Sequence, residues 1–93
     1  MGAEDLEEKH GEVAVIIRDY LLKSFLLDEK DLSMDMSLID SGIIDSTGIM
    51  EIVAFMEDTF GIEVDDRDLT PANFDSVSRL ASYVAQRHRD SQT

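Results

Sequence analysis

A serine beside an aspartate stands where a helix is predicted to begin, and this pair is the part of the sequence best suited to chemistry. The residues read Gly42-Ile43-Ile44-Asp45-Ser46. One interpretation is capping, in which either side chain accepts a backbone N–H bond of the first turn. One cap is enough, so if Asp45 supplies it, the hydroxyl of Ser46 lies outside the fold. Ser46 is then at the positive end of the helix dipole, where a phosphate ester is stabilised.

Enzyme motifs are missing around this pair and elsewhere in the sequence. A serine without a nearby base is a poor nucleophile, although it remains a handle that another enzyme can modify. The sequence has no Gly-x-Ser-x-Gly elbow, no His-Glu-x-x-His pair and no phosphate-binding glycine loop. His10 and His88 stand near opposite ends in polar contexts, and both are expected to be solvated surface side chains. We therefore predict no catalytic residue.

A calcium loop of the EF-hand type also fails. Asp31, Ser33 and Asp35 have the required alternate spacing. Loop position six needs glycine and is Met36, and position 12 needs glutamate and is Gly42. We predict no metal site.

Apolar residues recur at spacings of three and four in three segments, which predicts an all-α fold. The expected helices cover 12–27 (with a start left open between 3 and 12), 46–60, a turn or two after Thr70, and a segment that begins at Asp75 or Ser76. Gly61 is a suitable left-handed C-cap for the second helix. The predicted inward residues are Val13, Ile16, Ile17, Tyr20, Leu21 and Phe25, widened by Val15, Leu22 and Leu26; then Ile49, Ile52, Val53, Met56 and Phe60; then Val77, Leu80, Ala81 and Val84.

The connection 28–45 is long for so small a chain, and it is rich in apolar residues. Connections of this length are usually functional or well packed. We expect this one to pack across the helices, with a short helical turn, and we expect 90–93 to be a flexible tail.

Length and composition bound the remaining possibilities. Ninety-three residues, 43% of them hydrophobic, suit one domain over 1–93 with an ordered part of about 12–89. The net charge of -13 argues against direct binding to nucleic acid or an anionic membrane. The chain has no cysteine, which excludes disulfides and thiolate sites and suits a cytoplasmic location. No stretch is apolar enough to span a membrane, and the acidic N-terminus is unlike a signal peptide.

The acidity is concentrated in the middle of the chain. Residues 28–75 hold fourteen acidic residues against Lys30 and Arg67, a net charge of -12. This excess serves either solubility or the docking of cationic partners, and the charge count alone leaves both open.

The segment Leu38–Ser46, followed by a helix that ends Phe60-Gly61-Ile62, resembles the acyl and peptidyl carrier proteins. Their hallmark is Gly-x-x-Asp-Ser, which Gly42, Asp45 and Ser46 match. The resemblance covers about residues 13–87. It implies a four-helix bundle with three longer helices, one short helix and a long loop between the first two. It also implies 4′-phosphopantetheine on Ser46, attached by a phosphopantetheinyl transferase that uses coenzyme A and magnesium.

One position departs from the family's pattern. The family usually has Leu or Met after the serine, whereas this sequence has Thr47 and then Gly48. The departure affects the expectation of which partners dock. With Thr47 and Gly48 after the serine, this sequence is more similar to free-standing aminoacyl or peptidyl carriers, including the D-alanyl type, than to fatty-acid carriers.

The family places its partner contacts on the helix after the serine. By position these are Asp45, Met50, Glu51, Ala54, Glu57 and Asp58. Positions 50, 54, 57 and 58 share one helical face, where carboxylates would steer a basic enzyme surface. Each also has a plainer interpretation: Met50 as a core residue, and the acids as a solvated face.

The resemblance implies a monomeric carrier protein that is not itself an enzyme. Its arm would hold an acyl or aminoacyl group as a thioester, loaded by an acyl- or aminoacyl-activating ligase or adenylation enzyme. A downstream transferase or synthase of fatty-acid, polyketide, nonribosomal-peptide or related biosynthesis would receive it. The alternative is an unmodified acidic helical interaction module in which Ser46 is only a cap, so that Ser46→Ala costs about 0.5–2 kcal/mol.

Overall fold

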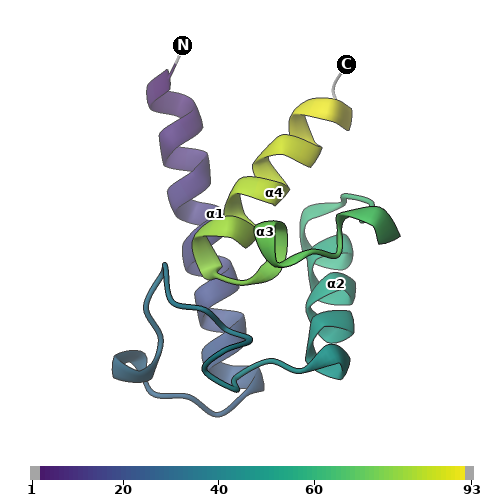
Figure 1. The fold of residues 1–93 in the computed structure, drawn as a ribbon. Helices are drawn as coiled ribbons and strands as arrows, with labels where there is room; N and C mark the ends of the chain where they lie inside the picture. The colour runs from purple at the N-terminus through teal and green to yellow at the C-terminus, as the bar shows by residue number, and fades with distance from the viewer. Residues whose placement is uncertain (1–2, 92–93) are drawn as a thin grey trace.

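Helices account for the regular structure of the computed structural model, which describes residues 3–91 and the side chains of 11–89 (Figure 1). The elements are α1 (Ala3–Ser24), η1 (Glu29–Asp31), α2 (Ser46–Phe60), η2 (Asp66–Asp68), α3 (Pro71–Phe74) and α4 (Val77–Ser91), where η1 and η2 are short 3-10 helices. No strand occurs between residues 3 and 91. The predicted all-α fold, with three longer helices and one short helix, is confirmed.

The start of α2 lies at one end of the molecule, and the start of α1 and the end of α4 lie at the opposite end (Figure 1). α1 and α4 pack together and diverge toward the ends of the chain, and α3 packs on α4. Tyr20 of α1 stacks on Phe55 of α2, with ring centroids 3.9 Å apart. No helix within residues 3–91 combines the length and the apolarity needed to cross a bilayer.

Most of the predicted core is confirmed. The residues assigned to the inward faces of α2 and α4 are all buried or half-buried, and Met56 is fully buried. The connection 28–45 contains η1 and buries Leu32, Leu38 and Ile44, so the expected packing of this loop is also confirmed.

The buried face of α1 is narrower than predicted. Val15 and Ile16 are 47% and 43% exposed, whereas Ala14, Ile17 and Leu21 are buried. Residues 14, 17 and 21 lie on one side of a helix, and each step along the chain turns a side chain by about 100°. The buried stripe of α1 therefore packs against the rest of the fold, whereas Val15 and Ile16 beside it remain exposed to solvent.

The end of α1 was predicted at Leu27, and this was wrong by three residues. The N–H of Leu27 donates to the carbonyl of Leu22 at 2.9 Å, and Leu26 has a φ of 54°. A backbone bond from residue 27 to residue 22, with a left-handed residue at 26, is a Schellman C-cap. The left-handed position of this cap is normally glycine. The cap ends α1 at Ser24 and turns Leu26 into solvent, 91% exposed, where the sequence pattern placed it on the buried face.

The other helix ends agree better with the sequence. α2 has the predicted bounds and ends at Gly61, whose φ is 66°. The hydroxyl of Ser76 accepts the N–H of Arg79 at 3.1 Å and so caps α4. α1 begins at Ala3, within the range left open, and α4 includes Asp90 and Ser91, which had been assigned to a flexible tail. Residues 92 and 93 of that predicted tail lie outside the described residues.

Candidate functional site

The first turn of α2 is capped by Asp45. Its Oδ1 accepts the N–H of Gly48 at 2.8 Å, and its carbonyl accepts the N–H of Ile49 at 3.0 Å. Ser46 is therefore the first helical residue, and it is exposed. Among residues 11–89 its hydroxyl has no hydrogen-bond partner, so the serine is not used as a cap.

Gly42 allows the chain to turn toward this helix. Its φ is 80°, a left-handed conformation that side chains disfavour, and its N–H donates to the carbonyl of Ile39 at 3.1 Å. Two residues later the N–H of Ile44 donates to the carbonyl of Leu38, also at 3.1 Å. These bonds fold the chain before Asp45 into a compact loop.

Gly48 explains part of the departure from the family's pattern. A Cβ atom at this position would lie 3.2 Å from Cγ2 of Ile44 and 3.4 Å from Cε1 of Phe25. The glycine therefore lets the loop and the end of α1 pack directly on the first turn of α2. Thr47, by contrast, is exposed. The sequence showed that Gly48 departs from the family's pattern, but the need for a small residue there is visible only from its packing against Ile44 and Phe25.

Asp75 holds the same loop from the corner between α3 and α4. Its carboxylate accepts the hydroxyl of Ser37 at 2.9 and 2.8 Å and the N–H of Ile39 at 3.0 Å. Its carbonyl accepts the N–H of Leu38 at 2.7 Å. The bonds from Ile39 and Ser37 hold the pKa of the Asp75 carboxyl below its ordinary value. Sequence reasoning considered Asp75 only as a helix cap, since its loop partners are 36–38 positions away.

The predicted partner face of α2 is open to solvent. Met50 is 55% exposed, and Glu51, Ala54, Glu57 and Asp58 are exposed as well. Glu57 has a structural role besides, because its Oε2 accepts the N–H of Val64 at 3.0 Å. No lysine or arginine occurs in α2 to offset these acids. The interpretation of Met50 as a core residue is therefore wrong.

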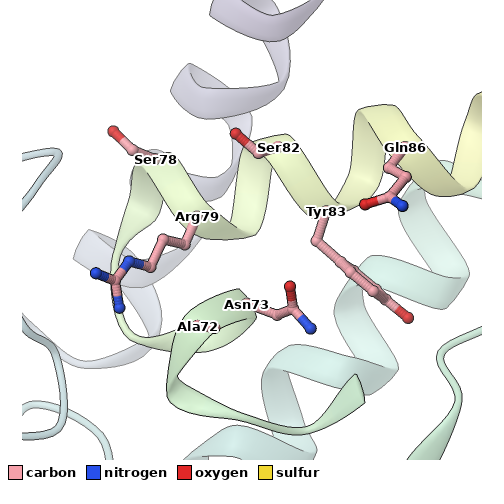
Figure 2. A pocket seen from close by; sticks show the side chains of 7 residues that line it. All are labelled: Ala72, Asn73, Ser78, Arg79, Ser82, Tyr83 and Gln86. Carbon is pink, nitrogen blue, oxygen red and sulfur yellow. The ribbon is translucent and has the colours of Figure 1, made fainter. Parts of the chain in front are cut away.

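A shallow hollow of about 290 Å³ lies between α3 and α4, away from every predicted site residue (Figure 2). It is lined by Ala72, Asn73, Ser78, Arg79, Ser82, Tyr83 and Gln86. At one side the hydroxyl of Tyr83 donates to Asp68 at 2.7 Å, and burial together with this bond raises the pKa of Tyr83 to about 12. Ser46 does not line this hollow but lies on the surface, which suits a group presented to other proteins.

Of the two histidines, His88 has its side chain in the part that the structure describes. Nε2 of His88 lies 2.7 Å from the carbonyl oxygen of Phe60, and the side chain is half-buried, so the predicted solvated histidine is wrong here. The side chain of His10 lies outside the part that the structure describes. Within that part no three histidine, cysteine or acidic side chains gather as metal ligands.

Residues 16–84 match the family of phosphopantetheine attachment sites. The chain belongs to this family. Its members carry a covalently attached 4′-phosphopantetheine and are not catalytic themselves, so the chain is a phosphopantetheine carrier and not an enzyme. The matched range includes the loop before α2, all of α2 and the Asp75 corner.

Individual relatives agree with this assignment. The D-alanyl carrier protein of Abiotrophia defectiva is 33% identical over 54 residues, which are 58% of this chain and 68% of that protein. A solved structure of KstB-PCP(apo) is 35% identical, with a TM-score of 0.65 over 78% of this chain and 82% of that chain. A crystal structure of an FAD-dependent dehydrogenase is 23% identical, with a TM-score of 0.66 over 73% of this chain and 97% of that chain. This last similarity is one of fold alone.

The first turn of α2 has the properties that a phosphodiester group needs. Ser46 offers an exposed hydroxyl, and the start of a 15-residue helix has the positive end of its dipole there. Asp45, the motif residue directly before Ser46, is already engaged with the N–H of Gly48. The residues present therefore fit the cofactor that the family carries.

Proposed function

We propose that Ser46 is the attachment point of 4′-phosphopantetheine and that the loaded arm delivers an acyl or aminoacyl group to partner enzymes. When bound, the cofactor supplies a thiol that holds this group as a thioester, which a chain without cysteine cannot supply itself. Gly42 shapes the turn and Asp45 caps the helix, so that the serine is presented.

The observation that carries this proposal is that Asp45, and not Ser46, caps α2. Asp45 accepts the capping bond from Gly48 at 2.8 Å, and Ser46 stays exposed on the first turn. If Ser46 were needed as the cap, its hydroxyl would be committed to a backbone N–H and modification would disrupt the helix. Because it is free, a phosphopantetheinyl transferase can reach it without unfolding α2.

The exposed face of α2 is the proposed docking surface for the partners. We define the α2 docking face as Met50, Glu51, Ala54, Glu57 and Asp58. Its acids would attract a basic enzyme surface and raise the association rate while leaving affinity modest, which suits a carrier that leaves each enzyme after delivery. Met50 adds an adaptable apolar contact.

The partners we propose are the transferase, a ligase or adenylation enzyme that loads the arm, and a downstream transferase or synthase. The similarity to a D-alanyl carrier protein and to KstB-PCP supports an aminoacyl or peptidyl cargo over a fatty-acyl one. We propose that the chain works as one domain and as a monomer. The cytoplasm is the proposed compartment, since a chain without cysteine suits reducing surroundings.

Intact-mass measurement tests the attachment. The full chain is incubated with coenzyme A, magnesium and a promiscuous phosphopantetheinyl transferase, and its mass is expected to rise by one phosphopantetheine group. Ser46→Ala should remain unmodified. Ser41→Ala is the matched control, because Ser41 lies in the same loop and its hydroxyl donates to the carbonyl of Leu38. An unmodified wild type, or a modified Ser46→Ala, would contradict the proposal and favour an unmodified interaction module.

A further inference from the structure

The loop before the attachment serine is folded by its own hydrogen bonds. The N–H of Ser41 donates to the carbonyl of Ser37, that of Gly42 to Ile39, and that of Ile44 to Leu38, each at 3.1 Å. The Ser37–Ile44 loop is therefore closed on itself and forms one hydrogen-bonded unit. Its C-terminal end continues directly into Asp45 and Ser46.

The other end of this unit is held by a residue far away in sequence. Asp75 receives three donors from it: the hydroxyl of Ser37, the N–H of Leu38 and the N–H of Ile39. The hydroxyl of Ser37 in turn accepts the N–H of Asp40 at 3.0 Å. A single residue at the α3–α4 corner thus orients the start of the loop through its carbonyl and both carboxylate oxygens.

Burial is a second constraint on this loop. Leu38 and Ile44 are 0% and 3% exposed, so the loop is also held by apolar contacts. The hydrophobic effect itself is non-directional, so the hydrogen bonds add a directional constraint to this packing. Hydrogen bonds to a charged acceptor are directional and are among the stronger ones in proteins.

We infer that Asp75 is a positioning residue for the modification of Ser46: it holds the Ser37–Ile44 loop so that the serine is presented in one orientation to the transferase. This inference rests on the proposed attachment at Ser46. Without the bonds of the Asp75 carboxylate to Ser37 and Ile39 the loop occupies several orientations, and the transferase binds only the fraction in which the serine is placed correctly. The apparent affinity for the carrier falls by that fraction, whereas the chemical step in the bound complex is unchanged.

The experiment compares the steady-state rates at which the transferase modifies full-length variants, at a temperature where each variant is folded. For Asp75→Ala we expect the KM for the carrier to rise about tenfold with kcat unchanged. Asp75→Asn should be close to wild type, because the amide keeps an acceptor for Ile39 and can donate to the Ser37 hydroxyl. Ser37→Ala, a milder change that leaves the Ile39 bond in place, should raise KM about threefold.

Asp68→Ala is the matched control for a structural effect. Like Asp75, Asp68 accepts a side-chain hydroxyl through its carboxylate: it accepts the hydroxyl of Tyr83, in α4, at 2.7 Å. Its loss should lower the melting temperature without changing KM. Amide exchange of Ile39, measured by NMR, should accelerate in Asp75→Ala and stay at the wild-type rate in Asp68→Ala.

The outcomes separate this inference from the proposal beneath it. A wild-type KM in both Asp75→Ala and Ser37→Ala, or an equal rise in Asp68→Ala, would overturn the positioning role and leave the attachment at Ser46 intact. A wild-type chain that accepts no phosphopantetheine would overturn the attachment, and the positioning role with it.

Discussion

The carboxylate of Asp75 accepts the hydroxyl of Ser37 through both of its oxygens, at 2.9 and 2.8 Å. The two residues are 38 positions apart, and their bond joins the α3–α4 corner to the loop that leads into α2. Phe74, directly before Asp75, is buried, as is Leu38, directly after Ser37. A charged acceptor at the edge of the core therefore fixes the register of two segments that meet only in the folded state.

The Asp75 bonds predict a loss of stability in acid. The folded-state pKa of Asp75 is lowered, first by the Ile39 N–H and then by the Ser37 hydroxyl. A lowered pKa means that the unfolded chain binds the proton more readily. The stabilising contribution is therefore full above the ordinary value of about 3.9 and is lost as the pH falls through the lowered one. Asp75→Asn should remove this part of the pH dependence.

Chemical denaturation midpoints at pH 6, 4 and 3 measure this effect. The difference between wild type and Asp75→Asn should shrink as the pH falls below about 4. Asp58→Asn is the control, because Asp58 is exposed and has no hydrogen bond among the described residues. A constant difference for Asp75→Asn across this range would contradict the assigned role of the carboxylate. Asp65 contributes in the same range, since its bonds with Arg67 lower its pKa to about 2, so it is left unchanged in both variants.

Asp45 and Ser46 should differ in their effect on stability. Asp45→Ala removes the acceptor of the Gly48 N–H and is expected to cost about 1 kcal/mol of unfolding free energy. Ser46→Ala removes no bond and should stay within about 0.5 kcal/mol of wild type. Urea denaturation of both variants, without the cofactor, checks this. The reverse order of effects would identify Ser46 as the cap and support the unmodified module.

Gly42 and Gly61 have a positive φ and open space around an added Cβ, so their alanine substitutions should cost similar stability. Gly42→Ala places a Cβ on a residue with a φ of 80° where nothing lies within 4 Å, so the cost is backbone strain alone, about 1–2 kcal/mol. Gly61→Ala should cost about the same at the end of α2. Gly11→Ala, inside α1 and equally uncrowded, should instead stabilise by up to about 1 kcal/mol.

Activity then separates Gly42 from Gly61. Gly42 lies in the loop before Ser46, so its alanine variant should also be modified more slowly by the transferase. Gly61→Ala, at the far end of α2, should lose similar stability and keep the wild-type rate of modification. Equal rates for the two variants would restrict Gly42 to a structural role.

The helices, the C-cap of α2 and the N-cap of α4 could be predicted because their signals are local. The bounds of α2 follow from Asp45 before it, apolar residues at spacings of three and four within it, and Gly61 after it. The Gly-x-x-Asp-Ser motif indicated the family in the same local way. For these features the residues that determine the structure are within a few positions of one another.

What the sequence did not predict depends on contacts across the fold. Nothing near Asp75 indicates that Ser37 and Ile39 will meet it, and nothing near His88 indicates the carbonyl of Phe60. Ile16 is apolar and correctly spaced, yet it remains exposed because the neighbouring helices cover only one side of α1. Periodicity identifies a helix, but the width of its buried face depends on what packs against it.

Leu26 predicts a stabilising substitution. It occupies the left-handed position of the α1 C-cap with a φ of 54° and is 91% exposed. Glycine adopts this conformation without strain, so Leu26→Gly should raise the unfolding free energy by about 1 kcal/mol. Leu26→Ala also removes the exposed side chain but keeps the Cβ, so it should remain near wild type. A gain shared by both variants would attribute the effect to the lost apolar surface instead.

The α2 docking face predicts a salt-dependent change in association. Glu51→Lys reverses a charge on an exposed side chain that has no bond to the rest of the described chain, whereas Glu57 also accepts the N–H of Val64 and is a poorer test. Association with the transferase, followed by stopped flow, should slow several-fold at low salt, because acids on this face steer a basic partner. The effect should nearly vanish at about 1 M salt, where the screening length is about 3 Å. Glu12→Lys makes the same change of net charge on α1 and should leave the rate near wild type, whereas an equal slowing would mean that net charge, not this face, governs docking.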